Sequence, residues 1–255
     1  MDVIITTGGI PAPGEPLIEC TQGQPKAMLE IGGKPMLQWV LDAFIDSPHV
    51  KHIVLVGLTD LQGLTCSKSV SLVPDQHDML ANIRAGLVKS LEVNPYEKHV
   101  LMAASDIPAI TAPMVNWVVE NTARHDADLI YNVVRRETME ARFPSANRTY
   151  IRLRDGDFCG GDLGTVRADL ALIDRSIWQI LISQRKNPVR QALTVGLDTL
   201  LGVITRTSTL EQTVRRACRS LQIQGVAVEC PFAEMAMDID KPHQLEIMRA
   251  DFDQG

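Results

Sequence analysis

The stretch Val3-Ile4-Ile5-Thr6-Thr7-Gly8-Gly9 indicates the fold class of this chain. Its apolar run reads as a buried strand, and the two glycines that follow end that strand. Further along, residues 35–46 carry apolar side chains at helical spacing, with a proline in the first turn. Residues 52–58 are a second apolar run of strand length. Strand, helix and strand in this order predict a right-handed crossover between parallel strands.

The same alternation of strand and helix continues along the chain. We predict further strands at residues 70–73, 99–104, 128–134, 150–154 and 225–230, and an extended piece at residues 237–240. We predict further helices at residues 78–91, 112–123, 176–185, 189–200, 210–221 and 243–252. This pattern predicts an α/β fold with a mostly parallel sheet, in which ligands gather at the carboxyl ends of the strands. No clean linker divides the sequence, so we expect one domain over residues 1–255 with an inserted subregion around residues 138–205.

The composition is that of a folded, acidic protein. The chain has 255 residues, 45% of them hydrophobic, and a net charge of -6, which excludes a disordered protein. An acidic protein repels the phosphate backbone of nucleic acid, so we expect no nucleic-acid partner. One stretch is locally basic, and it reads either as a solvated hairpin or as a surface that contacts phosphate. It contains Arg135, Arg136, Arg142, Arg148, Arg152 and Arg154.

The cysteines and the N-terminal residues bear on the compartment. The five cysteines show no CxxC spacing, which argues against a disulfide framework and a zinc site and favours a reducing compartment. The first residues run straight into a strand and lack the basic and apolar regions of a signal peptide. No apolar run approaches the roughly 18 residues that cross a bilayer. We therefore expect a cytoplasmic protein without a membrane partner, and the sequence leaves a homodimer open.

Two early segments have residue types that bind phosphate. Glycines after a first strand, here Gly8-Gly9, allow backbone N–H groups to surround a phosphate, although a structural turn explains them equally well. The segment matches neither the dinucleotide-binding nor the P-loop glycine pattern. Lys26 follows within Gln24-Pro25-Lys26. A lysine near a glycine loop is suited to offset the charge of a leaving pyrophosphate, although an isolated lysine is usually a solvated surface group.

Three carboxylates have the spacing of a metal site. Asp106 follows the predicted strand at residues 99–104, at the position where ligands bind in this architecture, although it is equally suited to cap a turn. Asp238 and Asp240 alternate along the extended piece at residues 237–240, so both side chains are expected to face one side. The alternative for Asp240 is that it caps the last helix. Mg²⁺ prefers oxygen ligands, so the three carboxylates together predict a Mg²⁺ site.

Taken together, these elements resemble the molybdopterin-guanylyltransferase-like (MobA-like) superfamily of nucleotidyltransferases. The matching motifs, in chain order, are Thr6-Thr7-Gly8-Gly9, Pro25-Lys26, Gly33-Lys34-Pro35, Asp106-Ile107-Pro108 and Asp238-Ile239-Asp240-Lys241-Pro242. Their order and spacing extend over nearly the whole chain. The resemblance implies a three-layer α/β/α sandwich with a mixed, mainly parallel sheet, the GT-A-like fold of nucleotide-diphospho-sugar transferases.

The resemblance also implies roles for particular residues. The catalytic residues would be Lys26 and Asp106, and the Mg²⁺ ligands would be Asp106, Asp238 and Asp240. The nucleotide-binding residues would be Thr7, Gly8, Gly9, Lys26, Asn82 and Gly86, with Asn82 near the base. A glycine-rich loop at Gly160, Gly161 and Asp162 would lie on the acceptor side. Arg135, Arg148 or Arg152 is expected to hold the acceptor.

Two departures from the family pattern affect these roles. Family members usually place an arginine in the signature loop, whereas no Lys or Arg occurs here before Gln24, and the loop carries Glu15 and Glu19. Asp162 stands where related chains often have asparagine. Both changes predict weaker binding of anions, so the loop is either rebuilt for another substrate or belongs to a slow or inactive enzyme.

The sequence thus predicts a Mg²⁺-dependent transfer of a nucleoside monophosphate from an NTP to a small and phosphorylated acceptor. The family resemblance favours GTP or CTP as the NTP. Pyrophosphate would leave. One alternative is a non-catalytic nucleotide-binding or regulatory protein on the same fold, which the missing loop arginine favours. A glycosyltransferase ranks lowest, because such enzymes place a D-x-D pair after the central strand. Here that place reads Ser105-Asp106-Ile107-Pro108.

Overall fold

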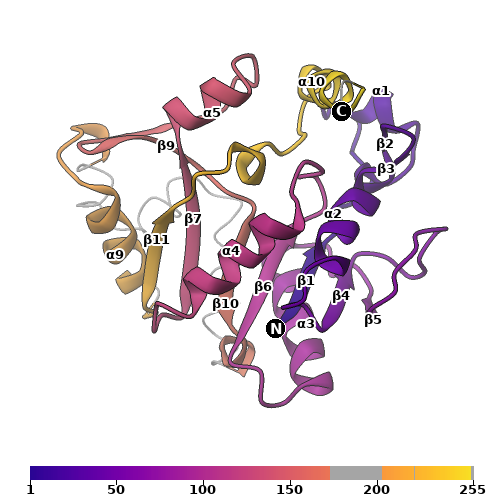
Figure 1. The fold of residues 1–255 in the computed structure, drawn as a ribbon, viewed down its shortest axis with the longest axis horizontal. Coiled ribbons are helices and arrows are strands. Elements are labelled where there is room, and N and C mark those ends of the chain that lie inside the picture. Colours follow the sequence, from indigo (N-terminus) through magenta and orange to yellow (C-terminus); the bar gives the residue numbers. More distant parts are fainter. Residues whose placement is uncertain (173–202, 221, 254–255) are drawn as a thin grey trace.

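A nine-stranded mixed sheet forms the centre of the protein in the computed structural model, which describes residues 1–172, 203–220 and 222–253 (Figure 1). The strand order is β5-β4-β1-β6-β10-β7-β9-β8, and β11 pairs with β7. The strands are β1 (Asp2–Thr6), β4 (His52–Val56), β5 (Ser69–Val73), β6 (His99–Ala104), β7 (Leu129–Arg135), β8 (Ile151–Leu153), β9 (Gly156–Gly160), β10 (Leu163–Arg167) and β11 (Gly225–Glu229). A separate small hairpin consists of β2 (Glu30–Ile31) and β3 (Lys34–Pro35).

Most strands of this sheet run in one direction. β1 is parallel to β4 and β6, and β4 is parallel to β5. β10 is antiparallel to both β6 and β7, so β7 and its parallel neighbour β11 point the same way as β6. The carboxyl ends of β1, β4, β5, β6, β7 and β11 therefore meet at one edge of the sheet. Ligands in this architecture bind at that edge.

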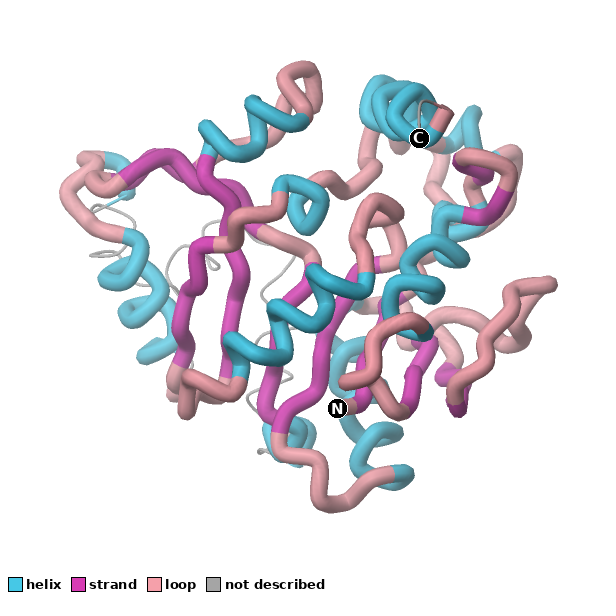
Figure 2. The backbone as a smooth tube through the Cα atoms, in the orientation of Figure 1, coloured by secondary structure: helices cyan, strands magenta, loops and turns pink. Residues whose placement is uncertain are grey.

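Helices cover both faces of the sheet (Figure 2). Buried apolar side chains form a core on each face. Along β1, Val3 and Ile5 pack into one core, and Ile4 packs into the other. The first core includes residues of α2 (Met36–Ile45), α4 (Ala112–Thr122) and α10 (Pro242–Phe252), and the second includes Leu87 of α3 (Met79–Val93). Strands buried on both faces read as continuous apolar runs, which explains the patterns of residues 52–56 and 99–104.

The short helical elements complete the chain. α5 (Arg136–Arg142) follows β7, and α9 (Leu210–Ser220) packs beside β11. α1 (Ile18–Thr21) lies within the long loop after β1. The single-turn segments are η1 (Lys26–Met28), η2 (Ala168–Leu172) and η3 (Ala233–Ala236).

The predicted α/β architecture is confirmed, and most predicted elements lie within two residues of their expected ends. The sequence patterns missed β9, β10 and the small β2-β3 hairpin, whose residues include several glycines and short runs. They also missed the short helical elements α1, α5, η1, η2 and η3. The extended piece at residues 237–240 forms no strand pairing. The helices predicted at residues 176–185 and 189–200 lie outside the described residues. None of the described helices is long and apolar enough to cross a membrane.

Candidate active site

A pocket of about 680 Å³ lies at the edge of the sheet where the parallel strands end. We call it the strand-end pocket. Its walls come from the segments that follow β1, β5 and β6, from η1, and from the segment that precedes α10. The lining residues are Thr6, Thr7, Gly8, Gly9, Ile10, Pro11, Glu15, Lys26, Asp75, His77, Asp78, Met79, Asn82, Ala104, Ser105, Asp106, Asp162, Asp238 and Asp240.

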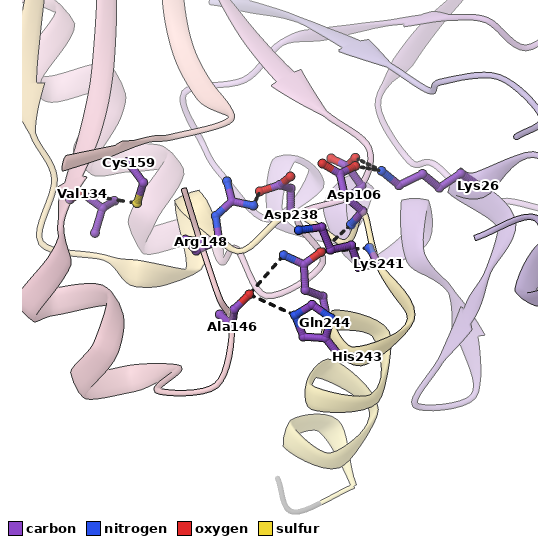
Figure 3. A network of polar contacts seen from close by, with 11 residues as sticks. Lys26, Asp106, Val134, Ala146, Arg148, Cys159, Asp238, Lys241, His243 and Gln244 are labelled. Atoms are coloured by element: carbon purple, nitrogen blue, oxygen red, sulfur yellow. Dashed lines mark hydrogen bonds and ion pairs between the residues drawn. The ribbon is translucent and has the colours of Figure 1, made fainter. Parts of the chain in front are cut away.

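Lys26 connects two carboxylates that are distant in sequence (Figure 3). Its Nζ donates to Oδ2 of Asp106 at 2.6 Å and to Oδ1 of Asp240 at 2.6 Å. Burial lowers the pKa of Lys26, but attraction to Asp106 and hydrogen bonds to both carboxylates outweigh this effect, so its pKa is raised above its ordinary value. Lys26 is therefore a fixed ammonium ion at neutral pH.

Backbone contacts hold the segments of Asp106 and Asp240 together. The N–H of Ser105 donates to the carbonyl of Thr6 at 3.1 Å, which continues the pairing between β6 and β1 beyond the strand ends. The N–H of Ile239 donates to the carbonyl of Asp106 at 3.0 Å, which ties the C-terminal acidic segment to the end of β6. The convergence expected from the sequence, with an early lysine near late carboxylates, is present in the structure.

Asp162 enters the same pocket from an interruption between β9 and β10. Gly160 pairs with Val133 of β7, and Thr165 pairs with Ile130, so two extra residues lie between the paired positions. This is a bulge, a feature that often reorients a side chain next to an active site. The Gly160-Gly161-Asp162 segment, expected to be a glycine-rich loop, begins at the last residue of β9, and residues 161 and 162 lie outside the strands.

Asp162 and Asp238 are buried carboxyl groups close to other carboxylates. Burial raises the pKa of Asp162 to about 7, and repulsion from Asp106 adds to this rise. Burial also raises the pKa of Asp238 to about 8, with repulsion from Asp162 as the next cause. Ionising both of two neighbouring buried carboxyl groups costs free energy, so the pair retains a proton near neutral pH.

Asp238 also forms an ion pair with Nη1 of Arg148 (Figure 3). Both side chains are largely buried, with exposed fractions of 14% for Arg148 and 11% for Asp238. Asp240 differs, because 59% of its side chain is exposed. Burial tends to raise the pKa of Asp240, but the hydrogen bond from Lys26 outweighs it and lowers that pKa. Asp240 does not cap the last helix: Lys241 occupies the N-cap position, and the Asp240 carboxylate binds Lys26.

The glycine segment forms the floor of the pocket. Gly8 has φ of +66°, a left-handed conformation that favours glycine, and the neighbourhood of its Cα is open. Gly9 is likewise open, and its carbonyl accepts a hydrogen bond from the N–H of Lys26 at 3.3 Å. The Thr7 hydroxyl donates to the carbonyl of Val56 at 3.0 Å. The Thr7 hydroxyl is thus engaged by the protein itself, so the backbone of residues 7–9 is the part that remains for contact with a ligand.

Asn82 lines the pocket, but its side chain is already engaged. Its amide nitrogen donates to Asp75 at 2.8 Å, and its oxygen accepts from the N–H of Gln76 at 2.7 Å. Asn82 therefore organises the segment before α3. One N–H and one lone pair of this side chain remain for a base.

Gly86 does not line the pocket, and its predicted contact with the nucleotide stays a prediction. A Cβ at this position would lie 2.6 Å from Cγ2 of Ile4. Glycine is needed here because α3 packs closely on β1. Gly160 and Gly161 are also absent from the pocket wall: the Tyr131 hydroxyl covers Gly160, and the N–H of Gly161 donates to Asn132.

A model of the MobA-like NTP transferase domain matches residues 21–155, which is more than half of the chain. The chain belongs to the MobA-like NTP transferase family. A hypothetical transferase from Thermus thermophilus is 31% identical, with a TM-score of 0.82, and the match covers 96% of this chain and 98% of that one. No curated protein matches the sequence.

More distant solved structures share the fold of this MobA-like chain. CMP:2-keto-3-deoxy-manno-octonic acid synthetase complexed with CTP has a TM-score of 0.58 at 16% identity, covering 99% of this chain and 98% of that chain. Molybdopterin-guanine dinucleotide biosynthesis protein A from Archaeoglobus fulgidus has a TM-score of 0.54 at 13% identity, covering 100% of both chains. These matches agree with the mixed, mainly parallel α/β fold expected from the sequence.

The pocket of this MobA-like protein is strongly acidic. Seven carboxylates line it, and Lys26 is the one Lys or Arg among the described residues of its wall. These carboxylates belong to Glu15, Asp75, Asp78, Asp106, Asp162, Asp238 and Asp240. The loop after β1, which lacks the arginine usual in the family, contributes the carboxylate of Glu15 to the pocket wall and no cation. A triphosphate is repelled here unless cations accompany it.

The donor set suits a metal that retains water and substrate ligands. No group of three His, Cys, Asp or Glu side chains within the described residues is arranged to hold a metal ion. The ammonium of Lys26 lies between Asp106 and Asp240. Mg²⁺ is usually bound by one or two carboxylates together with substrate phosphates. Asp106 Oδ1 and Asp162 Oδ2 are buried and receive no hydrogen bond from the described part of the chain. These oxygens fit such a cation.

Gln244 is a site residue that the sequence patterns did not single out (Figure 3). Its side-chain oxygen accepts from the N–H groups of Asp240 and Lys241, both at 2.9 Å, and its nitrogen donates to the carbonyl of Ala146 at 3.4 Å. Gln244 thus positions Asp240 and the segment that carries Arg148. Its place four residues after Asp240, at the third position of α10, is the signal by which it could be found.

Proposed function

We propose that this protein transfers a nucleoside monophosphate from an NTP to a small acceptor and releases pyrophosphate. The observation that carries the proposal is the meeting of Lys26, Asp106 and Asp240 at the strand ends, beside the open backbone of Gly8 and Gly9. Family membership supports the reaction class. GTP and CTP remain our two candidates for the nucleotide.

The reaction would be an in-line attack by an acceptor oxygen on the α-phosphorus. The new bond joins the acceptor oxygen to the α-phosphorus, and the bond between that phosphorus and the β-phosphate oxygen breaks. Lys26 would hold its positive charge against the phosphate oxygens, where charge grows as pyrophosphate leaves. The backbone of residues 7–9 would orient the nucleotide. Little acid–base chemistry is needed in such a transfer, so positioning and electrostatics dominate.

We propose Mg²⁺ as the accompanying cation, held by Asp106 with Asp240 or Asp238. When bound, it supplies charge neutralisation of the phosphate oxygens. The unpartnered oxygen of Asp106 supports its role as a ligand. The excess of carboxylates in the strand-end pocket supports a requirement for cations before any triphosphate enters.

The variant Asp106→Asn tests this proposal, because it keeps the size of the side chain and removes its charge. We expect pyrophosphate release from an NTP with Mg²⁺ to fall by about two orders of magnitude, in line with the loss of other electrostatic contacts in active sites. Asp60→Asn, an exposed aspartate outside the pocket, is the matched control. Turnover of Asp106→Asn near that of Asp60→Asn would refute the assignment of Asp106.

The acidity of the pocket also favours a second candidate, a nucleotide-binding protein without catalytic activity. Lys26 alone opposes seven carboxylates, and family members usually add an arginine in the signature loop. Calorimetric titration of the unmodified protein with each NTP and Mg²⁺, followed by an assay of pyrophosphate release with a panel of sugar phosphates, separates the two. Tight binding without release would support this second function.

A further inference from the structure

A second cavity is lined in part by Arg148. Its volume is about 280 Å³, and we call it the arginine cavity. Its walls come from α5, from the segment between α5 and β8, and from β8. The lining residues are Arg136, Glu140, Phe143, Pro144, Asn147, Arg148, Tyr150 and Arg152. The volume is below the roughly 300–1,000 Å³ of whole-ligand sites, so the cavity suits one group of a ligand.

The charge of the arginine cavity is opposite to that of the strand-end pocket. Three guanidinium groups line it, against the single carboxylate of Glu140. Arg136 is partly neutralised, because its Nε donates to Glu140 at 2.7 Å and its Nη1 lies 3.5 Å from Asp157. Arg152 pairs with Asp157 through the strand ladder, and its side chain forms no hydrogen bond or ion pair with the residues that the structure describes. A guanidinium fork matches the geometry of carboxylate and phosphate oxygens.

Arg148 joins the two sites and has an unsatisfied donor. Its Nη1 pairs with Asp238, which lines the strand-end pocket, whereas Arg148 itself lines the arginine cavity. Its Nε is buried and has no hydrogen-bond partner within the described residues. A buried donor without a partner is costly, so a ligand oxygen or water that reaches it is favoured.

We propose that the arginine cavity binds an oxyanion of the acceptor, a phosphate or a carboxylate group, through Arg152 and Arg148. The assignment of this oxyanion to an acceptor rests on the proposed function. An anionic acceptor is repelled by the seven carboxylates of the strand-end pocket, whereas the neighbouring cavity attracts it. The ion pair between Arg148 and Asp238 then places the acceptor beside the carboxylates proposed to hold the cation.

Binding of inorganic phosphate and of acetate to the full chain, measured by calorimetry with a metal chelator present, tests this inference. The variant is Arg152→Gln, and the matched control is Arg154→Gln, an exposed arginine two residues along that does not line the cavity. We expect saturable binding of at least one anion to the unmodified protein and to Arg154→Gln. We expect the affinity of Arg152→Gln to fall about tenfold, as for loss of one charge-assisted contact.

The two anions identify the acceptor class. Binding of phosphate alone would support a phosphorylated acceptor, and binding of acetate as well would support a carboxylate-bearing one. The absence of saturable binding of either anion, or equal affinities in the two variants, would overturn the inference. The assay contains neither nucleotide nor metal, so it reports on the cavity even if no NTP is turned over. Loss of transfer in Asp106→Asn, in turn, leaves the result at the cavity unchanged.

Discussion

The strand-end pocket and the arginine cavity differ in charge although one ion pair connects them. Seven carboxylates line the first against one ammonium, and three guanidinium groups line the second against one carboxylate. A site of the first kind accepts a triphosphate only together with cations, whereas a site of the second kind attracts an anion directly. The pair of Arg148 and Asp238 belongs to both regions. The following variants separate their contributions, from the largest expected effect to the smallest.

Lys26→Met should abolish most activity without affecting the arginine cavity. The change removes the one ammonium between Asp106 and Asp240. We expect kcat for pyrophosphate release to fall about 10²–10³-fold, the range for removal of one electrostatic contact to a transition state. Phosphate binding at the arginine cavity should not change. Lys51→Met, at an exposed lysine, is the control, and similar rates for the two variants would show that Lys26 is not needed.

Arg148→Gln should destabilise the fold strongly, because it removes the cation that pairs with a buried carboxylate. Breaking a buried pair on one side typically costs about 3–5 kcal/mol, and we expect the lower value because Asp238 can take up a proton. The Tm should fall by roughly 6–12 °C at about pH 8 and by less at about pH 6. Arg142→Gln, whose ion pairs with Glu234 and Asp251 are more exposed, should cost less than about 1 kcal/mol. Equal losses in the two variants would contradict the importance of the buried pair.

Gln244→Leu should weaken both regions moderately. The side chain is buried and makes three hydrogen bonds, to Asp240, Lys241 and Ala146. Leaving these backbone groups without partners should lower the free energy of unfolding by about 2 kcal/mol, as measured by urea denaturation. The exposed Gln212→Leu serves as the control. A change in stability no larger than in that control would mean that Gln244 positions neither segment.

The stability of the metal-free protein should fall as the pH rises from about 6 to about 8.5. The pKa values of Asp162 and Asp238 are raised to about 7 and about 8 in the folded protein, above the value near 3.8 of an unfolded aspartate. The folded protein therefore holds more protons in this window, so its free energy of unfolding decreases with pH. From about pH 6 to about pH 8.5 these two pKa values correspond to a loss of about 3–4 kcal/mol, or roughly 6–16 °C in Tm.

Two comparisons check the origin of this pH dependence. Asp162→Asn, which removes one carboxyl group of the pair, should flatten the curve of Tm against pH. Saturating Mg²⁺ should flatten it as well, since a bound cation replaces the shared proton. An unchanged slope in Asp162→Asn would assign the pH dependence to other groups.

Part of the site was predictable because Gly8-Gly9 and Asp106 follow strands that can be read locally, and parallel strands bring their carboxyl ends to one edge. Lys26 and Asp240 follow no strand directly, and short motifs pointed to them: a lysine after a glycine loop and two alternating carboxylates. Gly86 shows the limit of this reasoning. The family resemblance alone pointed to the ligand, whereas its close approach to Ile4 belongs to the packing between α3 and β1.

Apolar periodicity alone was enough to predict the α/β class, the sheet with buried faces and the order of its main elements, because burial imposes a regular spacing on each helix and strand. Three features required the folded chain: the bulge that presents Asp162, the ion pair of Arg148 with Asp238, and the engagement of Asn82 by Asp75 and Gln76. Each depends on contacts between segments or on the path of a single turn. Such contacts leave no periodic signal, because a side chain's partner is chosen by the three-dimensional path of the backbone and not by its neighbours in sequence.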